Sequence, residues 1–179
     1  IISTNLRFQP QFESWLKTRK YPNIELMPEN SRKEEEKLGA VRALADIAAK
    51  INEDMLVIAG DNLTTDNLKG FLHLFNEKHA PTIALYYAEN IDEARSGATV
   101  MVNKEGRILE FIEKPSNPKT ILVGACIYAF PVKICNSLKE YLRLRLPADE
   151  PGRFIEWLHK QEPVYGYMLK DYLWDIGTL

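Results

Sequence analysis

The sequence predicts an α/β fold in which helices flank a mixed, mostly parallel sheet. Amphipathic segments, with apolar residues three to four positions apart, alternate along the first half with short unbroken apolar runs such as residues 55–59. Such runs are typical of strands buried on both faces, as in a parallel sheet. Residues 98–102 and 107–112 flank the turn-forming stretch Asn-Lys-Glu-Gly, which predicts a hairpin. These patterns predict one layered domain, residues 1–179.

The expected elements follow one another without a repeat or a low-complexity segment. Residues 1–5 read as the end of a buried strand, and Pro10 then stands where helices begin. The further elements are, in order, a strand at 23–27, a helix at 38–51, the strand at 55–59, a helix with Phe71 and Phe75 on one face, a strand at 82–88, the hairpin, a strand at 121–130, a helix at 131–145, a short helix at 153–160 and one or two strands within 164–174.

Composition and charge exclude several classes of protein. Lys and Arg number 23 against 25 Asp and Glu, and 45% of residues are hydrophobic, which excludes a disordered chain. The balanced charge argues against a nucleic-acid-coating protein, and no apolar run approaches the ~20 residues of a membrane span. Cys126 and Cys135 match no disulfide scaffold or metal motif. Because residues 1–5 do not resemble a signal peptide, we expect a cytoplasmic location.

Two aspartates follow predicted strands, and ligands bind beyond the carboxyl ends of strands in open α/β sheets. Asp61 follows the most apolar run, and Gly60 before it allows close approach. Alternatively, Asp61 could cap the helix that follows, but residues 64–66 are better placed to cap it. Asp175 also ends a strand before a glycine, although an ordinary turn carboxylate would look the same. Together the two carboxylates would form a single-metal site, because Mg²⁺ prefers one or two carboxylates plus substrate oxygens.

The stretch Glu113-Lys114-Pro115 closes the second strand of the hairpin. A lysine can pair with a phosphate, and a glutamate can accept hydrogen bonds from sugar hydroxyls. Pro115 is expected to hold Lys114 in an extended conformation. By themselves these residues fit a solvated charge pair at a strand end better than a ligand site.

Three glycines raise a question of packing. Gly39 lies early in a predicted helix, where Ala would be better by roughly 1 kcal/mol, and Gly97 and Gly124 lie in predicted strands. Either a neighbouring element or a ligand should approach each of them closely.

Five stretches, taken in order, resemble the sugar nucleotidyltransferases of the glucose-1-phosphate thymidylyltransferase and mannose-1-phosphate guanylyltransferase type. They are residues 37–40 (KLGA), 57–62 (VIAGDN), 111–115 (FIEKP), 123–128 (VGACIY) and 174–178 (WDIGT). The resemblance implies a Rossmann-like, GT-A-like domain and an enzyme that binds a nucleoside triphosphate and a sugar 1-phosphate. An oxygen of the sugar phosphate would attack the α-phosphorus in line, giving an NDP-sugar and pyrophosphate.

The resemblance also implies roles for the residues singled out above. Asp61 and Asp175 would hold the Mg²⁺ cofactor, and Lys114 would act with them by holding the phosphate of the sugar. The sugar hydroxyls would bind Glu113. The remaining positions that would contact substrate are Gly97 and Gly124 at the sugar, and Leu38 and Gly39 at the nucleobase.

The sequence departs from that family at its start. The family's first strand and its Gly-x-Gly-Thr-Arg-Leu loop, followed by Pro-Lys, have no counterpart here, and residues 1–5 match the family's second strand. We therefore expect a domain incomplete at both ends and inactive by itself. Two alternatives are a non-catalytic sugar-nucleotide-binding or regulatory relative and a GT-A glycosyltransferase, although Asp61 is not part of an Asp-x-Asp pair. The base, the sugar and formation of a homo-oligomer are left open.

Overall fold

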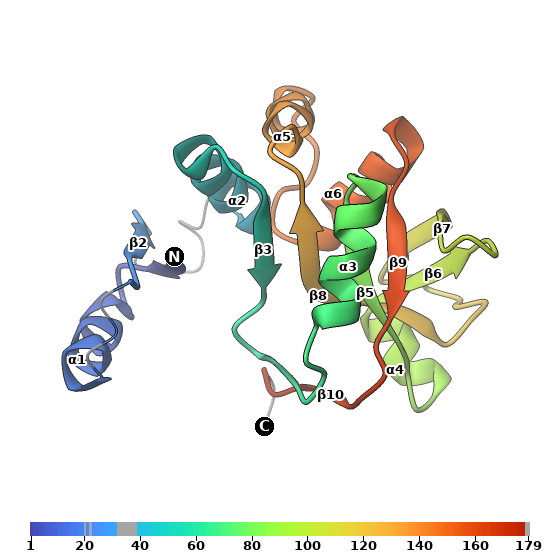
Figure 1. Ribbon diagram of the computed structural model, residues 1–179, viewed down its shortest axis with the longest axis horizontal. Coiled ribbons are helices and arrows are strands. Elements are labelled where there is room, and N and C mark those ends of the chain that lie inside the picture. The colour runs from blue at the N-terminus through green and yellow to red at the C-terminus, as the bar shows by residue number, and fades with distance from the viewer. Residues whose placement is uncertain (20, 22, 32–38, 178–179) are drawn as a thin grey trace.

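The computed structural model describes residues 1–19, 21, 23–31 and 39–177 (Figure 1). Its helices are α1 (Gln9–Arg19), α2 (Ala40–Ile51), α3 (Lys69–Lys78), α4 (Ile91–Ser96), α5 (Ile134–Arg143) and α6 (Pro151–Gln161). Its strands are β1 (Ile2–Asn5), β2 (Leu26–Glu29), β3 (Met55–Ile58), β4 (Asn62–Thr64), β5 (Thr82–Tyr87), β6 (Ala98–Val102), β7 (Ile108–Glu113), β8 (Leu122–Phe130), β9 (Tyr165–Met168) and β10 (Leu173–Asp175).

The main sheet has six strands and is organised around β8. β5 pairs along one edge of β8, whereas β6 and β3 share the other edge, at residues 123–124 and 127–130. β9 extends the sheet beyond β5, and β7 extends it beyond β6. The strands β3, β5, β6 and β9 run in one direction, and β7 and β8 run in the other. A mixed sheet with most strands in one direction and flanking helices confirms the predicted α/β class.

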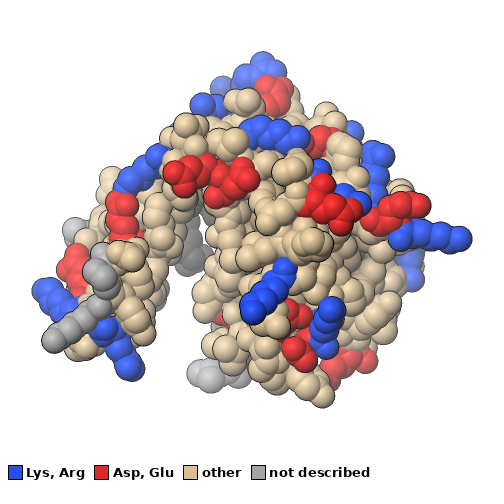
Figure 2. Space-filling model, in the orientation of Figure 1, with Lys and Arg blue, Asp and Glu red and all other residues tan. Residues whose placement is uncertain are grey.

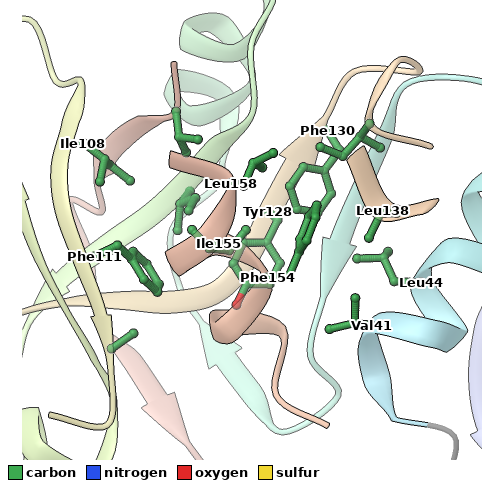
Figure 3. Packing of buried hydrophobic residues seen from close by; sticks show 14 of the residues in the cluster. Val41, Leu44, Ile108, Phe111, Tyr128, Phe130, Leu138, Phe154, Ile155 and Leu158 are labelled. Atoms are coloured by element: carbon green, nitrogen blue, oxygen red, sulfur yellow. The ribbon is translucent and has the colours of Figure 1, made fainter. Parts of the chain in front are cut away.

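Apolar side chains on the two faces of this sheet form two cores. Alternate residues of β8 divide between them, as the two-residue period of a strand requires: Tyr128 and Phe130 join the core under α2, α5 and α6, and Ile127 packs under α3. Figure 3 shows the larger core. The ring of Phe154 lies 6.2 Å from that of Phe130 and 5.4 Å from that of Tyr141. The described helices include none that is long and apolar enough to cross a membrane.

β1, α1 and β2 form an arm beside this body (Figure 1). β1 and β2 pair in parallel with each other, and no described strand of the main sheet pairs with either. α1 buries none of its side chains. Lys50 of α2 forms an ion pair with Glu25 near the start of β2, which links the arm to the body. Elsewhere a deep hollow lies between the arm and the body (Figure 2).

Two expectations about local structure are wrong. β3 is not buried on both faces, since Leu56 is 43% and Ile58 47% exposed. It pairs with β8 alone among the described strands, and α2 covers only the face of Met55 and Val57. Residues 131–133 form a turn, so α5 begins at Ile134 rather than at the proline.

A third difference concerns the segment after Asp61. Residues 62–64 form the strand β4 instead of leading straight into a helix. The expected side-chain cap from residues 64–66 is absent, since α3 has Leu68 as its N-cap residue, and Asp66 instead accepts a hydrogen bond from the Leu68 amide at 2.8 Å in a turn before the helix. The same carboxylate accepts from the Lys170 amide at 2.9 Å, which ties α3 to the segment before β10.

Candidate active site

Two segments far apart in the sequence meet beyond the end of β3. β10 pairs antiparallel with β4, with Asp175 opposite Asn62. The amide of Ile176 donates to the carbonyl of Asp61 at 2.8 Å. The pairing of these two short strands therefore places Asp61 beside Asp175, as the sequence predicts.

The two carboxylates face a common point. A Cβ added to Gly177 would lie 2.9 Å from Asp61 Oδ2 and 3.0 Å from Asp175 Oδ1. Two hard carboxylate oxygens fit a single Mg²⁺, which completes its octahedral shell with water and substrate oxygens. Within residues 1–19, 21, 23–31 and 39–177, no group of three His, Cys, Asp or Glu could form a fuller metal site. The two carboxylates therefore fit a divalent cation such as Mg²⁺.

Neighbouring groups orient both carboxylates. Asp175 Oδ1 accepts a hydrogen bond from the Gly177 amide at 2.8 Å, and Asp61 Oδ1 accepts from Asn62 Nδ2 at 3.1 Å. The amide oxygen of Asn62 in turn accepts from the Cys126 amide at 3.2 Å. This chain of contacts fixes the aspartates relative to β8, the central strand.

A cavity of about 250 Å³ opens beside Asp175. The sheet register explains how distant residues reach it, because Ala98 of β6 pairs with both Glu113 and Gly124. The residues of the cavity lining that the sequence singles out are Gly97, Glu113, Lys114, Gly124 and Asp175. The structure thus brings five of the predicted positions into one small cavity.

Glu113 is the buried carboxylate of this cavity, with 9% of its surface exposed. Its side chain lies against the first turn of α6, so closely that a Cβ on Gly152 would overlap its Oε2 atom. Burial, together with the negative charge of Glu150, raises the pKa of Glu113, although Lys114 and Arg153 oppose the shift. The charged form of this carboxylate is therefore destabilised unless hydrogen-bond donors compensate for its burial.

Lys114 differs from its expected geometry. The expectation that Pro115 keeps it extended is wrong, since Lys114 has φ 47, in the left-handed region. Its amide donates to the carbonyl of Gly97 at 2.9 Å, and its ammonium pairs with Glu150. These tertiary contacts override the local preference before a proline. Strained backbone of this kind tends to occur at functional sites.

The glycines are explained first by close packing of protein. A Cβ on Gly97 would lie 2.7 Å from Val123 Cγ1, and one on Gly124 would lie 3.0 Å from the ring of Phe111. Gly39 has φ +90, and a Cβ there would lie 2.5 Å from the carbonyl oxygen of Ala148. Of the two explanations left open by the sequence, a neighbouring element accounts for all three.

Gly39 lies apart from the small cavity, in the hollow between arm and body. This hollow has a volume of about 690 Å³ and is lined by β1, α2, β3 and part of β8. Cys126 and Tyr128 line both spaces, so the two are adjacent. Leu38, expected beside Gly39 at the nucleobase, lies outside the described residues.

The sequence alone missed three groups of the small cavity. The sequence predicted only a loop for the stretch that contains Glu150. The position of Glu150 in the sequence did not indicate that it would contact Lys114. Tyr86 also lines the cavity, and burial together with the charges of Glu93 and Asp175 raises its pKa to about 12. Burial raises the pKa of Cys126 as well, which favours its neutral thiol over the thiolate.

Known proteins resemble this chain in sequence. A family model described as "Nucleotidyl transferase" matches residues 1–179. The bifunctional protein GlmU of Methanocaldococcus jannaschii is 30% identical over 139 residues, which are 78% of this chain and 32% of that protein. The UTP–glucose-1-phosphate uridylyltransferase AglF of Haloferax volcanii is 33% identical over 95 residues, 53% of this chain and 39% of that protein. The chain thus spans about a third of the length of these curated relatives.

Solved structures share the fold. A crystal structure described as a glucose-1-phosphate thymidylyltransferase of Bacillus anthracis with sucrose has a TM-score of 0.81 at 20% identity, and covers 99% of this chain and 70% of that one. UDP-glucose pyrophosphorylase complexed with UDP-glucose has a TM-score of 0.73 at 19% identity, with coverage of 94% and 68%. At such identities the likeness concerns the fold alone, and it confirms the Rossmann-like architecture.

Proposed function

Because this chain belongs to the nucleotidyl transferase family, we propose that its protein transfers a nucleotidyl group from a nucleoside triphosphate to a sugar 1-phosphate. The products are an NDP-sugar and pyrophosphate. The observation that carries the proposal is the small cavity, in which Glu113, Lys114 and Asp175 lie together. A carboxylate, a cation and a metal-binding carboxylate in one cavity match a ligand with hydroxyls at one end and a phosphate at the other.

Within this proposal, each residue has a separate task. Lys114 pairs with the phosphate of the sugar, and Glu113 accepts hydrogen bonds from sugar hydroxyls. Gly97 and Gly124 form the cavity wall without side chains, which leaves their backbone accessible to the sugar. Gly39 lines the larger hollow and contributes to the nucleobase side.

Asp61 and Asp175 are proposed to hold Mg²⁺. When bound, the ion offsets the negative charge that collects on the phosphates as the new bond forms. The protein's own contribution is to fix the two carboxylates through the β4–β10 pairing and to place the sugar phosphate close to them. Holding both reactants in a fixed orientation removes much of the entropic barrier to an in-line attack.

The test is pyrophosphate release by the protein that carries these residues, with each NTP, a panel of sugar 1-phosphates and Mg²⁺. We expect release with at least one pair, and a loss of about 10²-fold or more in Asp61→Asn, Asp175→Asn and Lys114→Met. Binding of Mn²⁺, followed by its electron paramagnetic resonance, should weaken in both aspartate variants and not in Lys114→Met.

Two outcomes would contradict the proposal. Release that survives all three substitutions would exclude the site. Binding of a nucleotide sugar without release of pyrophosphate from any pair would instead favour the non-catalytic relative.

A further inference from the structure

The cation proposed to hold a phosphate already has an anionic partner within the protein. The ammonium of Lys114 is hydrogen-bonded to Glu150 Oε1. The second oxygen, Glu150 Oε2, lies 3.4 Å from Nε of Arg153. Lys114 and Glu150 both line the small cavity, so a protein carboxylate sits where the ligand's anionic group is expected.

The position of Glu150 is set by the chain around it. Glu150 immediately precedes α6, and its backbone is extended, with φ −106 and ψ 120. The following first turn of α6 packs against Glu113, so the loop that carries Glu150 is held over the end of β7. Arg153, the third residue of α6, also contacts Glu156 at 3.2 Å, which keeps its guanidinium on the same side as Glu150.

The contact between Lys114 and Glu150 is strong enough to orient the lysine and weak enough to exchange. The lysine side chain is 51% exposed and the glutamate 34% exposed. Water screens such a pair, so its contribution to an equilibrium is at most about fivefold. A phosphate monoester carries up to two negative charges and several acceptor oxygens, and it can replace one carboxylate at the ammonium.

We propose that Glu150 is an internal anion that occupies Lys114 in the ligand-free protein and that a phosphate-bearing ligand displaces it. The inference rests on the proposed function, because it takes Lys114 as the phosphate-binding cation. Glu150 is then a positioning residue that keeps the ammonium at the cavity and lowers the affinity for phosphate. Removal of its charge removes the competitor, so the affinity should rise.

The experiment measures binding of glucose 1-phosphate and of inorganic phosphate by isothermal titration calorimetry. The proteins are the unchanged protein, Glu150→Gln, Lys114→Met and the double variant. We expect Glu150→Gln to bind glucose 1-phosphate about two- to fivefold more tightly. In the Lys114→Met background, the same Gln substitution should give a much smaller gain, because the proposed competition acts through the lysine.

A matched control is Glu140→Gln. Glu140 is an exposed glutamate on α5 that pairs with Arg143 at 2.7 Å and does not line the cavity. Its substitution should leave binding unchanged, and circular dichroism of every variant shows whether the fold is intact.

The outcomes separate the two proposals. One outcome is that the unchanged protein binds glucose 1-phosphate and Lys114→Met loses this binding, while Glu150→Gln binds it equally well or more weakly than the unchanged protein. In that case the role of Glu150 is wrong and the proposed function stands. An equal gain from Glu150→Gln with and without Lys114 would also overturn it. If glucose 1-phosphate and inorganic phosphate bind none of the proteins, Glu150→Gln included, the role of Glu150 is wrong. Pyrophosphate release with the panel of sugar 1-phosphates then decides the proposed function separately.

Discussion

At the scale of single residues, Glu113 and Lys114 show what a short motif can and cannot specify. Their sequence predicted a carboxylate and a cation at the end of a hairpin strand, and both line the cavity. The left-handed backbone of Lys114 was not predictable, because it depends on the carbonyl of Gly97 and on Glu150, 36 residues away. The short motif identifies the chemical groups at the strand end, whereas tertiary contacts fix their geometry.

The raised pKa of Glu113 makes a testable link between stability and pH. Below its ordinary value of 4.5, folded and unfolded chains both carry the protonated acid. As the pH rises, the unfolded chain loses the proton first, so this residue's contribution to stability falls until the pH passes the folded pKa. Glu113→Gln keeps the neutral form at every pH. We expect the variant to gain stability over the unchanged protein between pH 4.5 and 7, measured by urea unfolding.

The matched substitution is Glu110→Gln, on the same strand. Glu110 is paired with Lys119 at 3.8 Å and is not buried. The difference between the two variants isolates the buried carboxylate from the other acids that titrate in this range. A pH-independent difference in unfolding free energy between Glu113→Gln and the unchanged protein would contradict the burial argument.

At the scale of elements, α6 approaches β7 most tightly at Gly152, whose missing side chain leaves room for Glu113. A helix interior normally gains about 1 kcal/mol when Gly becomes Ala. At Gly152 the added methyl group would overlap the carboxylate of Glu113 and force the side chain or the helix to move. We expect Gly152→Ala to lower the free energy of unfolding by about 1–3 kcal/mol, as overpacking does, and to weaken sugar-phosphate binding.

Gly60→Ala provides the comparison, because a Cβ there would meet nothing within 4 Å. Its unfolding midpoint should stay close to that of the unchanged protein. Equal stability of Gly152→Ala and the unchanged protein would show that α6 can shift at no cost. The measurement is thermal unfolding followed by circular dichroism.

Elements with a strong apolar pattern were predicted well, and short polar ones were not. β8, α2 and the β6–β7 hairpin lie close to their expected ranges because burial dictates their residues. β4 has three residues and no distinctive pattern, and it exists only because β10 pairs with it. The proximity of Asp61 and Asp175 could therefore be predicted from their positions at strand ends. The pairing of β4 with β10 that holds them together could not, because it is a tertiary feature.

At the scale of the whole molecule, the body and the arm differ in how they are held. β8 is paired on both edges and has a core on each face, so its amides should open only with the whole body. The arm has one two-stranded pair and a helix without buried side chains, an arrangement that is marginally stable by itself. Among the described residues, the ion pair between Lys50 and Glu25 and the packing of β1 and β2 beside α2 can couple the two parts.

Hydrogen exchange followed by mass spectrometry tests this difference. Local opening is governed by buried apolar contact and strand pairing, and the arm has little of either. We expect amides of β1 and β2 to exchange about tenfold or more faster than those of β8. Amides of the β6–β7 hairpin should exchange at an intermediate rate, since the hairpin is joined to β8 along one edge. A ligand that binds in the hollow lined by both parts should slow exchange in β1. Exchange of the arm as slow as that of β8 would mean that the ion pair between Lys50 and Glu25 and the packing beside α2 already couple the arm to the body.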